Sequence, residues 1–201
     1  SIVDDEICCE ASRQEVVRRY FKTACMVRQG LAGKQELNKM ELLMRTLGVD
    51  VNSRRTVPAA LAVAKATGEP ATAIELPDGQ IVTGKTSSLL GASAAALLNA
   101  LKVMAGIPDE LKLISPSVIQ PIQHLKVDHM GNRNPRLHTD EVLIALSICA
   151  ATNPTAEVAM EQLNKLRGCE VHSSVILSSV DEKVFRRLGV NITCEPLYET
   201  K

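Results

Sequence analysis

The sequence predicts an α/β protein in which helices cover both faces of a mixed sheet, with a helical hairpin added at the N-terminal end. Three observations predict this class. Long stretches place apolar residues at helical spacing, and short stretches between them alternate apolar and polar residues as strands do. Residues 71–85 combine two such short stretches around the turn sequence Pro77-Asp78-Gly79, which is typical of a β-hairpin. This order of elements satisfies a three-layer α/β/α arrangement.

The N-terminal stretch predicts the helical hairpin. From Asp4 to Val27, apolar side chains recur on one side of a helix that begins with acidic residues. A second helix follows Gly33 and stops at Gly48, where a left-handed cap is expected. The next residues form a polar linker, so we expect a helical subdomain at residues 1–55 and a three-layer domain at residues 56–201.

The rest of the chain alternates between helices and strands. A helix at residues 57–67 precedes the β-hairpin, and the stretch 89–104 predicts a helix that is apolar almost all round. Such a helix is buried between layers or at a subunit contact, and the stretch is short for a membrane span. The remaining elements are a strand at 111–115, helices at 117–125, 139–151 and 154–168, a strand at 171–177, a helix with the capping box Ser179 and Glu182, and a strand at 190–194.

Composition argues against several classes of protein. The 23 basic and 23 acidic residues leave a net charge near zero, which disfavours a dedicated nucleic-acid or membrane surface. Aromatic residues make up 2% of the chain and Trp is missing, so a base-stacking platform is not expected. The six cysteines show no C-x-x-C spacing and no signal sequence accompanies them, which favours reduced thiols in the cytoplasm.

Residues 79–86 match the phosphate-loop pattern G-x-x-x-x-G-K-[ST] letter for letter. The four residues between the glycines prefer a strand, so the first glycine belongs to the hairpin turn and not to a phosphate cradle. A weaker role remains for Lys85, Thr86 and Ser87. If they leave the strand and open a helix, their backbone N–H groups and the lysine could hold an anion without hydrolysing it; a solvated lysine and a capping hydroxyl are the alternative.

The segment 128–141 has the highest density of polar functional groups. Its guanidinium and amide groups suit a carboxylate or a phosphate, and they belong to Asn132, Arg133, Asn134 and Arg136. The helix that starts after His138 adds a positive dipole, so we expect an anion site. The alternative is a loop whose arginines brace neighbouring carbonyl groups.

Three residues are candidates for proton transfer. His138 and Glu141 lie three apart on one helix face, and His172 lies on a strand. A hydrogen-bonded histidine in a half-buried strand is the alternative for His172. Asp128 and His129 could join a metal or acid–base set, but neither H-E-x-x-H nor a paired C-x-x-C is present, so we predict no metal site.

Three motifs carry a resemblance to a known family: Leu-Pro-Asp-Gly-Gln-Ile-Val-Thr-Gly-Lys-Thr at 76–86, Gly-Asn-Arg-Asn-Pro-Arg-Leu-His-Thr-Asp-Glu at 131–141 and Leu-Gly-Val-Asn-Ile-Thr at 188–193. They resemble the uncharacterised bacterial family called domain of unknown function 1846 (UPF 0371), over the whole chain. The resemblance implies the C-terminal portion of a protein about twice as long, whose N-terminal half is a partner. It also implies a fold similar to the cytidine-deaminase-like three-layer architecture.

The resemblance does not supply an activity. Some relatives carry the label ATP-dependent zinc protease, but this sequence has neither a convincing phosphate loop nor a zinc-protease helix. Deaminase chemistry needs H-x-E and P-C-x-x-C around a zinc-bound water, and the spacing of His138 and Glu141 differs from that motif. The cofactor and the reaction stay open.

The sequence therefore favours a domain that binds a small anionic ligand, such as a phosphorylated one, between Lys85 and Thr86 and the loop 133–138. In this hypothesis the domain could be half of an enzyme, with His138 or His172 as the proton carrier. One alternative is a non-catalytic oligomerisation or docking module that uses the helix 89–104 and the N-terminal hairpin, for which a homo-oligomer is expected. The other is a metal-dependent hydrolase.

Overall fold

The predicted β-hairpin forms the start of the sheet in the computed structural model, which describes residues 2–200 and side chains from residue 6 onward. Strand β1 (Ala71–Glu75) pairs antiparallel with β2 (Ile81–Lys85), and Gly79 turns the chain between them with a φ of 83°. β1 also pairs antiparallel with β3 (Glu170–Ser173), and β3 pairs parallel with β4 (Asn191–Cys194). Within the described residues the chain is α/β, with a four-stranded mixed sheet in the order β2-β1-β3-β4.

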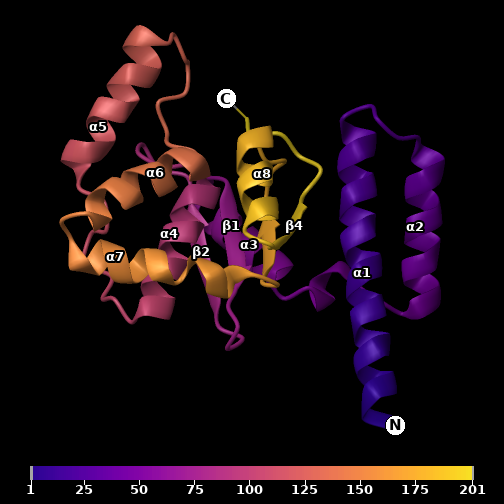
Figure 1. The fold of residues 1–201 in the computed structure, drawn as a ribbon. Helices are drawn as coiled ribbons and strands as arrows, with labels where there is room; N and C mark the ends of the chain where they lie inside the picture. Colours follow the sequence, from indigo (N-terminus) through magenta and orange to yellow (C-terminus); the bar gives the residue numbers. More distant parts are fainter. Residues whose placement is uncertain (1, 201) are drawn as a thin grey trace.

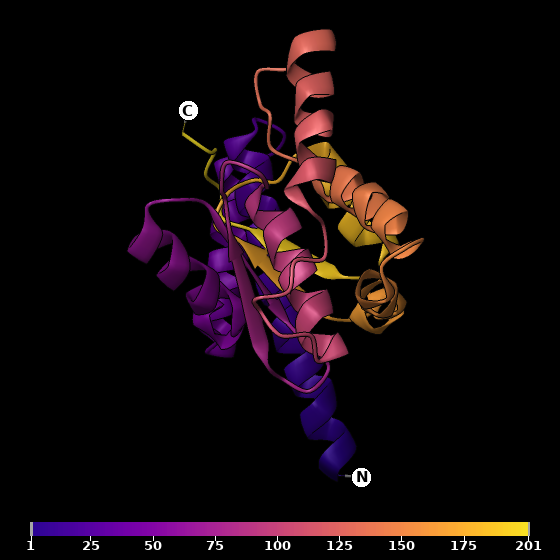
Figure 2. The same ribbon diagram turned by 90° about the vertical axis from the view of Figure 1, so that its left-hand side faces the viewer.

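Helices lie on both faces of this sheet (Figures 1 and 2). Helix α3 (Thr56–Thr67) packs on one face, beside α1 (Ile2–Arg28), which also contacts β4. Helix α4 (Ala92–Ala105) packs on the other face against β1 and β2. Helices α6 (Thr139–Ala150) and α7 (Pro154–Glu161) pack against α4, and helix α8 (Ser179–Arg187) packs against α6 and β4.

The main core lies between the sheet and α4. Alanines of α4 allow a close approach, and Gly84 of β2 lies directly against them: a Cβ atom at Gly84 would lie 2.1 Å from the backbone nitrogen of Ala96. Most of the apolar surface of α4 is buried inside this core. The prediction that this helix lies between layers is correct. Because α4 is buried in the core, it does not offer the contact surface that the hypothesis of an oligomerisation or docking module assigned to it.

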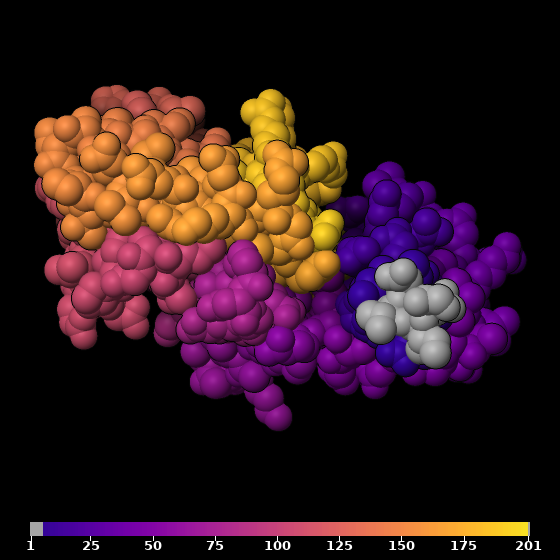
Figure 3. All heavy atoms as spheres, turned by 60° about the horizontal axis from the view of Figure 1, so that its bottom comes forward, coloured from indigo at the N-terminus to yellow at the C-terminus, as the bar shows by residue number. Residues whose placement is uncertain are grey.

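The N-terminal helices form a hairpin, as predicted. Helix α2 (Lys34–Leu47) packs along α1 and ends at Gly48, which is left-handed with a φ of 62° and donates its N–H to the carbonyl groups of Met44 and Arg45. A 3-10 turn, η1 (Val51–Ser53), capped by Asp50, leads to α3. Figure 3 shows the hairpin as a lobe beside the α/β part.

Several predicted boundaries are wrong, and local side-chain chemistry explains them. Residues 111–115 do not form a strand, because Ser115 caps helix α5 (Pro116–His124) and Pro108 and Pro116 confine the segment between them. The π-helix η2 (Leu125–His129) extends α5 into the predicted loop. α7 stops early and is followed by the 3-10 turn η3 (Leu163–Leu166).

Two further boundaries concern the candidate site. The helix expected directly after Lys85 begins at Ala92, because Ser87 forms a turn whose hydroxyl accepts the N–H groups of Leu89 and Leu90. β3 stops at Ser173, whose hydroxyl donates to the carbonyl of Val175. The cap of α8 is Ser178, one residue before the predicted one.

Candidate anion site

The two segments that the sequence marked as candidates lie side by side. Leu90, in the loop before α4, and Leu137, in the loop before α6, form a parallel β-bridge. The N–H of Leu137 donates to Leu89 at 2.9 Å, and the N–H of Gly91 donates to Leu137 at 3.2 Å. The loop after β2 therefore runs next to the loop before α6.

A cavity of about 90 Å³ opens beside this bridge. Four of the predicted site residues line it: Thr86, Asn134, Arg136 and His138. Three helices begin at the cavity, since the N-cap residues of α4, α6 and α8, which are Gly91, His138 and Ser178, all line it. The positive ends of three helix dipoles thus converge on one small space.

The three helix starts differ in how their backbone N–H groups are satisfied. At α6, the N–H of Thr139 donates to the Asp181 carboxylate at 2.9 Å. At α8, the N–H of Asp181 donates to the hydroxyl of Ser178 at 3.1 Å. At α4 the cap is Gly91, and the N–H groups of residues 92–94 have no acceptor among the described residues. The N–H groups of Asp140, Ser179 and Val180 at the other two starts also have no acceptor among the described residues. The start of α4 is therefore the most open of the three, and an anion in the cavity would supply the missing acceptors.

Thr86 lies next to this open helix start. Its backbone N–H donates to Pro70 at 2.9 Å, and only 4% of the residue is exposed. Within the part of the chain that the structure describes, its hydroxyl has no hydrogen-bond partner, although it lines the cavity. The hydroxyl is not among the fully buried side-chain atoms that lack a partner, so it is accessible from the cavity and can donate a hydrogen bond to a ligand there.

His138 is held by Asp181 of α8. Its Nδ1 lies 3.1 Å from Oδ2 of Asp181, whose Oδ1 accepts the hydroxyl of Thr139 at 2.8 Å. The hydrogen bond to Asp181 raises the pKa of His138 above its ordinary value, against the opposing effect of burial. Burial also opposes ionisation of Asp181, but hydrogen bonds from His138 and Thr139 outweigh it and lower the pKa of that carboxyl. Because Nδ1 pairs with Asp181, Nε2 is the ring nitrogen of His138 that can form a hydrogen bond with a ligand in the cavity.

Lys126 of η2, which is 3% exposed, holds the loop before α6 in place. Its ammonium donates to the carbonyl of Arg136 at 2.6 Å and to the Glu141 carboxylate at 2.7 Å. Glu141 in turn accepts the backbone N–H of His138 at 2.8 Å. Glu141 therefore caps α6 and fixes the loop, and it does not line the cavity, which favours a structural role over the catalytic one that we predicted.

The guanidinium of Arg136 stays at the cavity. Its Nη1 donates to the carboxylate of Glu199 at 2.8 Å, and both side chains are partly exposed. Asn134 accepts the backbone N–H of Arg136 through its side-chain oxygen at 3.0 Å, which forms a turn that sets the direction of the loop.

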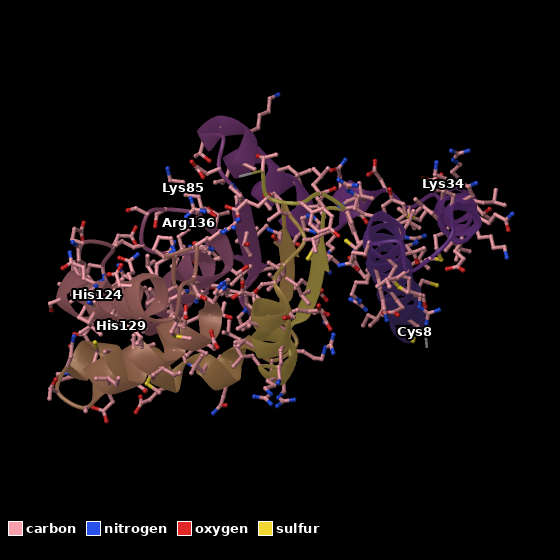
Figure 4. All side chains as sticks on the ribbon, turned by 90° about the horizontal axis from the view of Figure 1, so that it is seen from above. Cys8, Lys34, Lys85, His124, His129 and Arg136 are labelled. Atoms are coloured by element: carbon pink, nitrogen blue, oxygen red, sulfur yellow. The ribbon has the colours of Figure 1, made fainter. Side chains whose placement is uncertain are left out.

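Other predicted ligand-binding residues lie near the cavity but do not line it. Lys85 ends β2 with an exposed side chain, on the same side of the α/β part as Arg136 (Figure 4). Ser87 uses its hydroxyl in its own turn. Asn132 and Arg133 are exposed in the loop and do not line the cavity. Four of the ten predicted site residues, Thr86, Asn134, Arg136 and His138, therefore line the cavity together.

His172 lies elsewhere. It is fully buried in β3, where Nδ1 lies 2.7 Å from the hydroxyl of Thr193 and Nε2 lies 3.1 Å from Glu195. Burial lowers its pKa. Its ring packs at 4.7 Å from that of Phe21 of α1, and it does not line the cavity. This environment favours the packed, hydrogen-bonded histidine that was the alternative reading.

The metal set considered from the sequence does not assemble. His129 packs against His124 at a ring distance of 5.0 Å on the helix α5 and its extension, and His124 pairs with Asp128 there. Figure 4 shows His124 and His129 together. Among the described residues, no group of three or more histidine, cysteine or acidic side chains could hold a metal ion.

Sequence reasoning missed five polar residues that line the cavity: Ser93, Ser173, Ser178, Asp181 and Glu199. Asp181 approaches His138 from 43 positions away, and Glu199 approaches Arg136 from 63. Only Asp181 left a local signal, as the fourth residue of the box Ser178-x-x-Asp181.

The fold and the cavity define a mixed α/β protein with a helical hairpin and a small polar hollow at three helix starts. The chain belongs to the family whose models are described as "Domain of unknown function DUF1846", as its sequence motifs predicted. The C-terminal model of that family matches residues 52–201, and the N-terminal model matches residues 1–48.

Curated relatives agree with this assignment. A UPF0371 protein of Corynebacterium efficiens is 54% identical over 201 residues, which are 100% of this chain and 41% of the relative. A UPF0371 protein of Streptococcus thermophilus is 51% identical over 199 residues, 99% of this chain and 40% of the relative. The chain therefore spans about two fifths of the length of these relatives, less than the half that we expected. None of the described helices is both long and apolar enough to cross a membrane.

Proposed function

We propose that this part of the family protein binds a small anionic group, of the size of a phosphate, at the start of α4. The observation that carries the proposal is the open start of α4, whose N–H groups meet a cavity that is also lined by Thr86, whose hydroxyl is free to donate. Arg136 supplies a planar cation and His138 a second donor at the same cavity.

The size of the cavity supports a single anionic group. A volume of about 90 Å³ is about three times the share of one liquid water molecule, which is roughly 30 Å³. The group bound there would be a phosphate, sulfate or carboxylate, while the rest of a larger ligand would lie outside.

For the α/β part we propose a cytidine-deaminase-like architecture. A mixed sheet with one antiparallel hairpin is compatible with that architecture.

The proposal predicts a large difference between two arginines of one loop. Arg136→Ala should weaken the binding of inorganic phosphate by about tenfold or more, since a charge-assisted hydrogen bond is worth roughly 1.5–3 kcal/mol. Arg133→Ala removes the same charge from the same loop but from outside the cavity, so it should bind phosphate like the parent protein. Isothermal titration calorimetry at constant ionic strength measures both.

Melting temperatures with nucleotides, sugar phosphates and carboxylates would then rank ligand classes. Phosphate affinities that are equal in the parent protein and both arginine variants would remove the site. A loss of equal size in both variants would indicate a general charge effect instead of a cavity.

The role of His138 predicts how binding depends on pH. A bound anion favours the imidazolium form, so affinity should be highest below the pKa of His138 and fall as pH rises through it. That pKa is raised above 6.5, so the fall should lie above pH 6.5. Sulfate is the suitable probe because its charge is constant over the range in which histidine titrates, roughly pH 5 to 8.

The matched variant for this measurement is His138→Gln, which keeps a hydrogen-bonding side chain beside Asp181. The other charged groups near the ring are Asp181, Glu141 and Lys126, together with Arg136 and Glu199 at the rim. Sulfate affinity that falls equally with pH in parent and variant would assign the dependence to another group.

A further inference from the structure

A segment that follows β4, residues 195–200, connects the cavity to the helical hairpin. Its backbone is tied to the loop after β3, where the N–H of Ile176 donates to the carbonyl of Leu197 at 2.7 Å. The guanidinium of Arg28, the last residue of α1, lies over the ring of Tyr198 at 5.2 Å from its centroid. This contact joins the segment to the end of the hairpin.

The residue after Tyr198 reaches the cavity. Glu199 lines it and accepts the hydrogen bond from Arg136 at 2.8 Å. The two side chains are 34% and 42% exposed, so the ion pair is weak and can exchange with other anions. A ligand anion at the cavity requires the same guanidinium fork that Glu199 occupies.

We propose that a phosphate-type ligand and the carboxylate of Glu199 compete for Arg136, so that the Glu199 side chain leaves the cavity when the ligand binds. This inference rests on the proposed function. Displacement of Glu199 also moves its neighbour Tyr198, which weakens the contact with Arg28. The segment therefore couples occupancy of the cavity to the end of the N-terminal hairpin, and the coupling acts in both directions.

The competition has a quantitative consequence. The observed affinity for the ligand equals the intrinsic affinity multiplied by the fraction of molecules in which Arg136 is free of Glu199. For an exposed ion pair of ordinary strength, removal of the competing carboxylate should raise phosphate affinity by about two- to fivefold.

The two tyrosines of the chain, Tyr20 and Tyr198, make this testable by fluorine NMR. The protein labelled with 3-fluorotyrosine should give two resonances, which Tyr20→Phe assigns. Titration with inorganic phosphate at constant ionic strength should shift the Tyr198 resonance in a saturable way. The Tyr20 resonance should stay in place, because its ring packs on Phe21 within α1 at 5.4 Å.

The deciding variant is Glu199→Gln. It should bind phosphate about two- to fivefold more tightly than the parent protein, and its Tyr198 resonance should lie closer to the ligand-bound position before phosphate is added. Glu182→Gln, which removes a carboxylate from the exposed surface of α8, is the control for net charge and should bind like the parent protein.

The outcomes separate the two proposals. If Glu199→Gln and the parent protein bind phosphate with equal affinity, or the Tyr198 resonance does not move at saturation, the competition is overturned while the anion site stands. If none of the three proteins shows saturable binding, the proposed function itself is overturned.

Discussion

Replacement of Gly84 by alanine is expected to lower the free energy of unfolding by about 3 kcal/mol, at the upper end of the usual cost of overpacking. The added Cβ atom would lie 2.1 Å from the nitrogen of Ala96, 2.6 Å from its Cα and 2.7 Å from the carbonyl carbon of Ala95. All three are backbone atoms of α4, so no side-chain rotation can relieve the contact, and the helix must move away from the sheet.

Urea denaturation of the parent protein and Gly84→Ala measures this change. Gly33→Ala is the matched control, because a Cβ atom there meets nothing within 4 Å and its φ of −86° suits any residue. Its cost as a cap should stay below about 1 kcal/mol. Similar destabilisation in both variants would show that the loss of glycine as such, and not the contact with α4, is responsible.

This contact gives a physical reason for the apparent phosphate-loop motif. Gly79 is needed for the turn of the β-hairpin, where its φ is 83°, and Gly84 is needed for the approach of β2 to α4. Lys85 is exposed at the end of the strand. Two glycines with unrelated packing reasons and a surface lysine therefore produce the pattern, which is why the pattern alone was a poor guide to nucleotide binding.

Local signals predicted most of the elements correctly. Gly48 and the pair Asn153 and Pro154 marked helix ends that the structure contains, since caps depend on residues a few positions apart. The strand predicted at residues 111–115 failed for the same reason, because the competing cap of Ser115 is equally local and was overlooked. Strand β3 was predicted too long, since its serines bind nearby backbone groups.

The candidate site could be predicted only in part. Arg136 and His138 could be predicted because many polar functional groups lie close together in their segment of the sequence. The open start of α4 could not be predicted, because it depends on where the helix begins, three residues beyond the predicted start at residue 89. The partners Asp181 and Glu199 depend on the packing of α8 and of the segment after β4, which no spacing within one stretch of sequence encodes.

The second large effect is expected at Arg54, in the linker between the hairpin and α3. Its residue is 2% exposed, and its guanidinium donates to the hydroxyl of Thr193 at 2.8 Å and to the carbonyl groups of Val171 and Asn191 at 2.7 Å each. It also pairs with the carboxylate of Glu170. Burial lowers the pKa of Arg54, and the charge of Glu170 opposes this shift.

Arg54→Met should therefore lower the free energy of unfolding by about 4 kcal/mol, because it removes the donor from the buried carbonyl groups of Val171 and Asn191, each worth about 1–3 kcal/mol. Glu170 keeps hydrogen bonds from Arg18 and Asn191. Arg55→Met is the neighbouring control. Its pair with Glu75 is exposed, so its cost should be less than about 1 kcal/mol. Chemical denaturation compares the two, and an equal cost would contradict the importance of burial.

Arg54→Met also tests whether His172, like His138, contributes to the anion site. The sequence analysis named both histidines as candidate proton carriers. Arg54 and His172 share the hydroxyl of Thr193, so loss of Arg54 disturbs His172 directly. Neither residue lines the cavity at His138. Arg54→Met, while folded, should therefore bind phosphate with the affinity of the parent protein, whereas weaker binding would mean that the network around His172 supports the anion site through the sheet.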